Sequence, residues 1–277
     1  MIRFAVFLLL YVLTATGGEQ PISLILEADL LHISGDLTGA RDKLQEALNS
    51  DPTNIFGRNL LGLVFLKLDQ PQEAAEQFSY VQVLDPVNET AATWLGIIAL
   101  HENDIEGALA EFNGILESDP DNANAHYFVG SLYLMRGQYE SALNHLIQSR
   151  DADIGEPETH YRLGMAFHSL DLLANAELSY RRALELDSRH QGARCGLGWI
   201  LHARGDSEGA LNEWQRVLQI NESNQEARSN MAKVIHEAAL SSYNHGDLDR
   251  ARTLWNRLQR IDPGNKAARH YLQVLNK

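Results

Sequence analysis

Apolar residues recur along most of the chain at the three- and four-residue spacing of amphipathic α-helices, and the helices come in pairs. In the stretch GLVFLKLDQPQEAAEQF, residues 62–78, one apolar helical pattern ends at a short polar turn and a second begins. Each helix has one apolar face to bury against a neighbour. The pattern predicts an all-α chain built from helix–turn–helix units.

The helix pairs repeat with a fixed period. Alanine returns every 34 residues from Ala40 to Ala210 and once more, 41 residues later, at Ala251. A small residue precedes each alanine by twelve positions, and a large residue follows it by four. Four units also end in Asp-Pro, with Asn two residues after the proline. In chain order these columns are Ala28, Gly62, Gly96, Gly130, Gly164, Gly198 and Ala239; Ala40, Ala74, Ala108, Ala142, Ala176, Ala210 and Ala251; Leu44, Phe78, Phe112, Leu146, Tyr180, Trp214 and Trp255; and Pro52, Pro86, Pro120 and Pro263.

Each column has a physical reading. The small residues predict a close approach of the two helix backbones within a unit, and the large residue fills space between neighbouring units. Proline ends the second helix, because the residue before a proline is pushed out of the α region. This 34-residue pattern resembles the tetratricopeptide repeat (TPR) family. The resemblance covers residues 21–265 and implies a right-handed α-solenoid of seven TPR helix–turn–helix units with a concave inner groove, followed by a C-terminal capping helix.

The period sets the expected boundaries. Repeat seven carries seven extra residues, around 225–231, which is two helical turns to within about 20° and keeps the same face inward. We therefore expect 225–244 to form one long helix. The predicted repeats are 21–54, 55–88, 89–122, 123–156, 157–190, 191–224 and 225–265, and the predicted capping helix is 266–277.

The first eighteen residues are expected to be a targeting segment rather than part of the fold. Arg3 is followed by an apolar run from Phe4 to Leu13 and then by small residues up to Gly18, which is the layout of a secretory signal peptide. The run is short of the ~20 apolar residues that span a bilayer. Residues 1–18 are thus predicted to be a cleaved signal peptide that exports the protein, with a periplasmic location favoured over an extracellular one. A retained N-terminal membrane anchor is the alternative.

In proteins that this chain resembles, the first helices of the repeats line the groove through a fixed set of positions. Carried over residue by residue, these positions give an aromatic and sulfur-rich centre, of the kind that recognition surfaces use. The candidate partner-binding residues are Phe56, Asn59, Leu63, Thr93, Ile97, His101, Tyr127, Ser131, Met135, Tyr161, Met165, His168, Cys195, Trp199 and His202. The Lys, Arg and Asn pattern of the carboxylate-clamp TPRs is absent, since those positions hold Ile, Thr, Tyr and Leu.

Composition narrows the function classes. The net charge is −14 at pH 7, which disfavours nucleic acid as a partner, because phosphates require clustered Lys and Arg. A single cysteine, Cys195, excludes an intrachain disulfide and any CxxC motif. The chain contains no HExxH, GxSxG or Walker sequence, so no enzyme is expected and no catalytic residue is assigned. The 11 histidines are interpreted as general usage, so no metal site and no cofactor is expected.

These observations predict a protein–protein interaction scaffold that binds a peptide or a segment of a partner protein in the groove. TPR proteins that resemble it assist the assembly of envelope machines such as pili, secretion systems or polysaccharide exporters. The alternative is a TPR docking subunit tethered by the retained N-terminal segment, in which case the membrane is also a partner.

Overall fold

A computed structural model describes residues 20–153 and 155–275, so the predicted signal peptide lies outside the described residues. Within these ranges the chain forms helices and no strands. The helices are α2 (Gln20–Ser34), α3 (Leu37–Ser50), α4 (Ile55–Lys67), α5 (Pro71–Leu84), α6 (Glu89–His101), α7 (Ile105–Ser118), α8 (Ala123–Met135), α9 (Tyr139–Ala152), α10 (Pro157–Ser169), α11 (Leu173–Leu186), α12 (Gln191–Ala203), α13 (Ser207–Ile220), α14 (Gln225–Asn244), α15 (Leu248–Ile261) and α16 (Lys266–Leu275).

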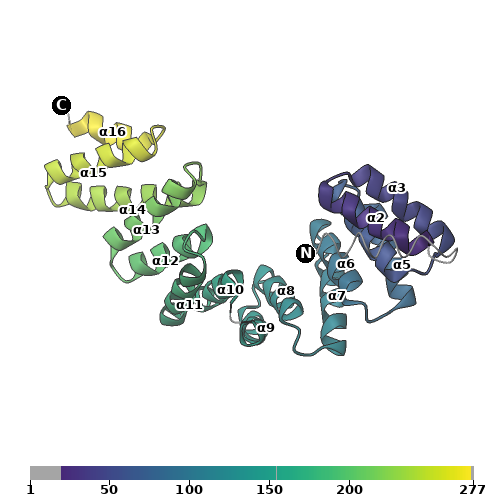
Figure 1. The fold of residues 1–277 in the computed structure, drawn as a ribbon. Coiled ribbons are helices and arrows are strands. Elements are labelled where there is room, and N and C mark those ends of the chain that lie inside the picture. The colour runs from purple at the N-terminus through teal and green to yellow at the C-terminus, as the bar shows by residue number, and fades with distance from the viewer. Residues whose placement is uncertain (1–19, 154, 276–277) are drawn as a thin grey trace. The chain divides into compact units, whose positions relative to one another are not determined.

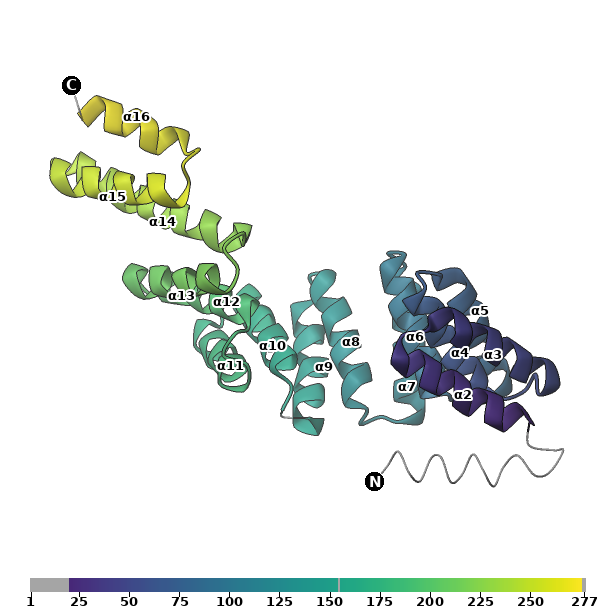
Figure 2. The same cartoon turned by 45° about the horizontal axis from the view of Figure 1, so that its top comes forward.

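The predicted all-α solenoid of seven helix pairs and a capping helix is confirmed. The chain divides into two compact units, one ending at Leu132 and the other beginning at Tyr133, within α8. In the N-terminal unit α2 to α7 contact one another in chain order, and in the C-terminal unit α9 to α16 do the same. Figures 1 and 2 show α10 to α16 as a stack in which each helix lies beside the next. Among the described helices, none is long and apolar enough to cross a membrane.

Each helix pair turns on a residue with a positive φ angle. Gly205, for example, has φ +88° between α12 and α13, and Asp171 has φ 59° between α10 and α11. This left-handed conformation is open to glycine and tolerated by Asn and Asp. The complete set, one residue for each pair, is Gly35, Asp69, Asn103, Gly137, Asp171, Gly205 and Gly246. These residues form a further repeat column, where the helical pattern had indicated only a polar turn.

Asp and Asn residues cap helices on both sides of the boundary between repeats, Asp through its backbone N–H and Asn through its side chain. At the end of α3 the backbone N–H of Asp51 donates to the carbonyl of Ala47, and Asn54 Oδ1 accepts from the N–H of Gly57 at 2.9 Å to cap α4. Asn54 Nδ2 also donates to Asp51 Oδ2 at 3.1 Å, which joins the two caps. These hydrogen bonds satisfy backbone groups that a helix terminus leaves unpaired.

The caps explain why proline is dispensable at a boundary. Between α13 and α14 the sequence is Asn-Glu-Ser-Asn without proline. The N–H of Asn221 still bonds to the carbonyl of Val217, and Asn224 Oδ1 accepts from the N–H of Ala227 at 2.9 Å. The second helix therefore ends at a cap, with proline as an addition in the four units that have it.

The core consists of small residues facing large ones. Every alanine of the repeating column is fully buried, as are the rings of Phe78, Phe112 and Trp214. A Cβ atom added to Gly62 would lie 2.5 Å from the ring of Phe78, and one added to Gly198 would lie 2.4 Å from Trp214. The glycine column thus makes room for the large ring of its own unit. The sequence pattern had suggested instead that the glycine lets the two helix backbones approach each other and that the ring fills the space between units.

The large rings also contact the next unit. Phe128 of α8 stacks on Phe112 of α7 with ring centroids 4.4 Å apart, and Tyr271 of α16 stacks on Trp255 of α15 at 4.3 Å. Buried rings of this size contribute most of the packing energy of a small repeat. Each ring therefore holds its own helix pair together and fastens the following helix to it.

Candidate partner-binding face

The candidate partner-binding residues lie on α4, α6, α8, α10 and α12, which are the first helices of five of the pairs. In each compact unit, the surface that they form is the first-helix face. In the N-terminal unit Phe56 of α4 is 59% exposed, and His101 at the end of α6 is also exposed. The other candidates in this unit are partly buried. This second group consists of Asn59, Leu63, Thr93, Ile97, Tyr127 and Ser131.

In the C-terminal unit all but one of the predicted residues reach the surface. Met135 is 62% exposed, while the side chains of α10 and α12 are partly buried. The partly buried set is Tyr161, Met165, His168, Trp199 and His202.

Cys195 is a correction to the predicted set. Its side chain is 1% exposed, in a core cluster that also contains Met231 and Val234 of α14. Its thiol is covered, whereas the side chains at the equivalent positions of the four preceding repeats reach the surface. Burial raises the pKa of Cys195 to about 12, so the thiol is neutral at pH 7. It cannot contact a partner.

Trp199 has the best-defined surroundings on this face. Its ring packs against Trp214 at an interplanar angle of 72°, with centroids 5.4 Å apart, and the Lys233 ammonium lies 5.3 Å from its centroid. His202, one turn along α12, is 6.1 Å away. Because its ring packs against the buried Trp214, Trp199 is held in place while part of its surface stays exposed.

Tyr161 is engaged in packing between helices. Its ring lies 6.2 Å from Tyr180 and 4.8 Å from His190, and a Cβ added to Gly192 would come within 2.7 Å of it. Burial raises the pKa of its hydroxyl. Tyr161 therefore fastens α10 to α12 as well as bordering the first-helix face, a role that its repeat position did not indicate.

His190 is a structural residue, although its repeat position had suggested only general usage. Its Nδ1 accepts from the N–H of Ala193 at 3.1 Å and caps α12, as Asn does at other boundaries. Its Nε2 then carries the proton and donates to Glu158 at 2.9 Å. This hydrogen bond, together with the charge of Arg162, holds the pKa of Glu158 below its usual value. Glu158 therefore links α10 to α12 as a carboxylate.

His202, a histidine of the face, forms ordinary polar contacts. His202 Nδ1 lies 3.1 Å from Ser207 Oγ, and its Nε2 lies 3.8 Å from Glu237. In the part of the chain that the structure describes, no three His, Cys, Asp or Glu side chains are grouped so as to hold a metal ion. The face is mostly aromatic and apolar, and it also carries hydrogen-bonding side chains such as Asn59, Ser131 and His202.

One family model for the tetratricopeptide repeat matches residues 59–123 and 161–227 of this chain, and a second tetratricopeptide repeat model matches residues 99–161. The chain belongs to the tetratricopeptide repeat family. Its helix pairs are accordingly TPR units, and α2, α4, α6, α8, α10, α12 and α14 are their first helices. No protein of curated function matches the sequence significantly.

Solved TPR structures share the fold at low sequence identity. The C-terminal part of a TPR protein from Cytophaga hutchinsonii is 15% identical, with a TM-score of 0.70, over 89% of this chain and 98% of that one. PilW, described as a type IV pilus biogenesis factor, is 17% identical, with a TM-score of 0.65, over 76% and 97%. YrrB, a TPR protein described as having an unusual peptide-binding site, is 22% identical, with a TM-score of 0.57, over 72% and 99%.

Proposed function

We propose that this TPR protein is an interaction scaffold that binds a peptide or a segment of a partner protein on its first-helix face. The observation that carries the proposal is Trp199, a large aromatic side chain that is supported by Trp214 yet only partly buried. Partly exposed, rigidly held aromatic residues supply much of the binding energy in protein interfaces. Met165 and His168 on α10 border the same face and add adaptable apolar and polar contacts.

A peptide or protein partner fits the chemistry of the face better than a small charged ligand. Most candidate side chains are apolar or aromatic, and Glu158 is already bonded to His190 and Arg162. The peptide-binding site described for YrrB gives a precedent on the same fold. The proposal assigns no reaction to the protein and no cofactor.

The proposed setting is the bacterial periplasm. The support is the signal-peptide pattern of residues 1–18, together with the fold similarity to PilW, a pilus biogenesis factor. We propose that the scaffold assists assembly of an envelope complex of the pilus, secretion or polysaccharide-export kind. The alternative is a docking subunit that keeps the N-terminal segment as an anchor. The mass of the protein recovered from cells separates the two, since export with cleavage removes about 18 residues.

Site-specific crosslinking tests the proposed face. A photoreactive amino acid is placed at His168, on the first-helix face, and in a parallel protein at Leu178, which is 70% exposed on the second helix α11. The two positions belong to the same TPR unit, so expression and folding are matched. We expect a discrete partner adduct in cells from position 168 and little from position 178, with mass spectrometry identifying the partner. Adducts from 178 alone, or from neither position, would overturn the proposal.

A further inference from the structure

The seven extra residues of the seventh TPR unit shift its second helix along the first. In the sixth unit the small residue that receives the large ring is Gly198, eight residues after the cap His190. In the seventh unit the cap is Asn224, and the small residue eight positions later is Ala232. The large ring of this unit, Trp255, belongs instead to the column of Ala239, seven residues further on. In the seventh unit, therefore, the repeating column places no large ring against Ala232, the residue that follows the cap by eight positions.

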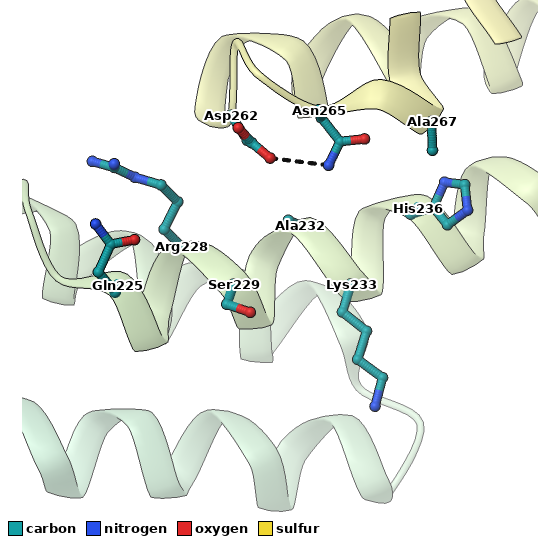
Figure 3. A pocket seen from close by; sticks show the side chains of 9 residues that line it. All are labelled: Gln225, Arg228, Ser229, Ala232, Lys233, His236, Asp262, Asn265 and Ala267. Carbon is teal, nitrogen blue, oxygen red and sulfur yellow. Dashed lines mark hydrogen bonds between the residues drawn. The ribbon is translucent and has the colours of Figure 1, made fainter. Parts of the chain in front are cut away.

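One side of the first turns of α14 lines a pocket. Its volume is about 480 Å³, and Ala232 lies on its α14 side between Ser229 and Lys233. Figure 3 shows α14 below and the chain that leads into α16 above, with Asp262, Asn265 and Ala267 facing α14 across the space. The pocket lies wholly within the C-terminal unit. It results from the insertion, because a second helix in the regular position would pack against these turns.

The insertion also changes the surroundings of one arginine. In the sixth unit Arg194, the fourth residue of α12, donates through Nη2 to the carbonyl of Ser188 and through Nη1 to Glu213 of α13, both at 2.6 Å. In the seventh unit Arg228, the fourth residue of α14, makes the same backbone contact through Nη2 to Glu222.

The acidic partner of this arginine is missing from the seventh unit. The residue that precedes the large ring is Glu213 in the sixth unit but Leu254 in the seventh. Within the described ranges, Arg228 forms no ion pair with an acidic side chain. Asp262, the only carboxylate among the described residues that line the pocket, accepts hydrogen bonds from Gly264 and Asn265 in its own loop. The Arg228 guanidinium thus lines the pocket, and no carboxylate of the described residues takes the place that Glu213 occupies beside Arg194.

A second cation connects the pocket to Trp199. Lys233 lines the pocket with its stem, and in Figure 3 it points away from the loop toward the neighbouring helix. Its ammonium lies 5.3 Å from the centroid of the Trp199 ring, and no carboxylate in the described part of the chain pairs with it. In a protein of net charge −14, two unpaired cations beside one pocket are a local departure from the average surface.

We propose that the pocket between α14 and the loop before α16 binds an acidic segment of the partner protein. A carboxylate side chain of the segment bonds to Arg228 in the way that Glu213 bonds to Arg194. The segment then crosses α14 past Ala232 toward Lys233 and Trp199, where apolar side chains are bound. This inference rests on the proposed function and adds a charge requirement to it. It differs from the carboxylate clamp, whose cationic pattern the groove positions lack.

The test uses two labelled peptides and fluorescence anisotropy with the whole protein. The acidic probe is Gly-Ser-Glu-Leu-Glu-Leu-Gly-Ser, and its matched control has glutamine in place of both glutamates. We expect the acidic peptide to bind at least tenfold more tightly at low salt. Arg228→Gln should reduce that preference at least fivefold, and Lys233→Gln should reduce it to a smaller degree. Arg189→Gln removes one exposed positive charge outside the pocket and should leave the preference unchanged.

The outcomes separate this inference from the proposed function. Arg228 also supports the start of α14, so a melting curve accompanies its variant, whereas Lys233→Gln removes no backbone contact. Equal affinity for the two peptides, or equal loss with Arg189→Gln, would overturn the acidic pocket. So would complete displacement of the acidic peptide by millimolar inorganic phosphate, which would indicate a site for small anions. If the crosslink from position 168 persists in these cases, the scaffold function stands without the pocket.

Discussion

Replacing Gly198 with alanine should destabilise the C-terminal unit, although alanine is the better helix former. The new Cβ would lie 2.4 Å from Nε1 and 2.7 Å from Cε2 of Trp214, well inside van der Waals contact. Trp214 is fully buried, and its Nε1 donates to the carbonyl of Cys195 at 3.1 Å. The rigid ring cannot move away without weakening that hydrogen bond and its packing.

Three effects set the magnitude of this destabilisation. Overfilling a packed core costs about 1–3 kcal/mol. Weakening the buried Trp214 hydrogen bond costs about 1 kcal/mol more. Exchanging glycine for alanine inside a helix returns about 1 kcal/mol. The loss of the hydrogen bond and the gain in helix propensity nearly cancel, so the free energy of unfolding should fall by the cost of overfilling, about 1–3 kcal/mol.

Urea denaturation followed by circular dichroism and tryptophan fluorescence measures this change. The matched control is Gly114→Ala in α7, where nothing lies within 4 Å of the added Cβ. That variant should gain up to about 1 kcal/mol from helix propensity alone. If Gly198→Ala is neutral or stabilising while its melting remains cooperative, the glycine column does not exist to accommodate the ring.

The seventh TPR unit shows how an alanine can occupy this column. There Ala239 takes the place of glycine, and Trp255 donates its Nε1 to the side chain of His236 at 3.3 Å. In the sixth unit the residue at the position of His236 is Cys195, and the donor reaches its backbone carbonyl instead. In the seventh unit the hydrogen bond from Trp255 to the His236 side chain thus replaces the bond that Trp214 makes to a backbone carbonyl in the sixth unit. Gly198→Ala lacks such an acceptor.

Three further predictions concern the first-helix face and its surroundings. Trp199→Ala should weaken partner binding by roughly tenfold or more and cost only about 0.5–1.5 kcal/mol of stability, through the loss of its contact with Trp214. Trp214→Ala should cost about 3–5 kcal/mol of stability. The reverse pattern in calorimetry and binding would refute the assignment of Trp199 to the binding face and of Trp214 to the core. Cys195 should react with a thiol reagent at pH 8 far more slowly in the native protein than in denaturant, and equal rates would contradict its burial. Glu158→Gln should lower the free energy of unfolding at pH 7 by about 0.5–1 kcal/mol, because the half-exposed carboxylate bonds to His190. Since the folded-state pKa of Glu158 is lowered, this stabilisation is present above the pKa of the unfolded state and is lost as the pH falls through the pKa of the folded state. A stability difference between the wild type and Glu158→Gln that grows in acid would exclude this mechanism.

The helix pairs and their period could be predicted because each column acts locally. A buried alanine and a small residue facing a large one recur in every unit and require no knowledge of distant parts of the chain. The long helix Gln225–Asn244 was predicted for the same reason and is confirmed, since the seven extra residues preserve the helical phase. The turn residues, such as Asp171 and Gly205, were not singled out from the sequence, although they recur with the repeat and all of them tolerate a positive φ.

The exposure of individual face residues could not be predicted in this way. Carrying over groove positions assumes that each unit is covered by a regular neighbour. Cys195 is instead enclosed in a cluster with Met231 and Val234 of the lengthened α14. Tyr161 is drawn into packing because Gly192 opposite it has no side chain. Both outcomes depend on the shape of the next unit, which a single repeat position does not encode.

The hydrogen bonds at the unit boundaries bear on the binding proposed for the first-helix face. The cap residue of one first helix often bonds also to the preceding first helix: Asn224 Nδ2 donates to Gln191 at 3.1 Å, as His190 does to Glu158. These bonds, with the ring of Tyr161 over Gly192, fix α10, α12 and α14 against their neighbours before a partner arrives. A face that is ordered in advance loses little conformational entropy on binding. Variants that break a boundary bond should therefore weaken binding even when the altered residue never touches the partner.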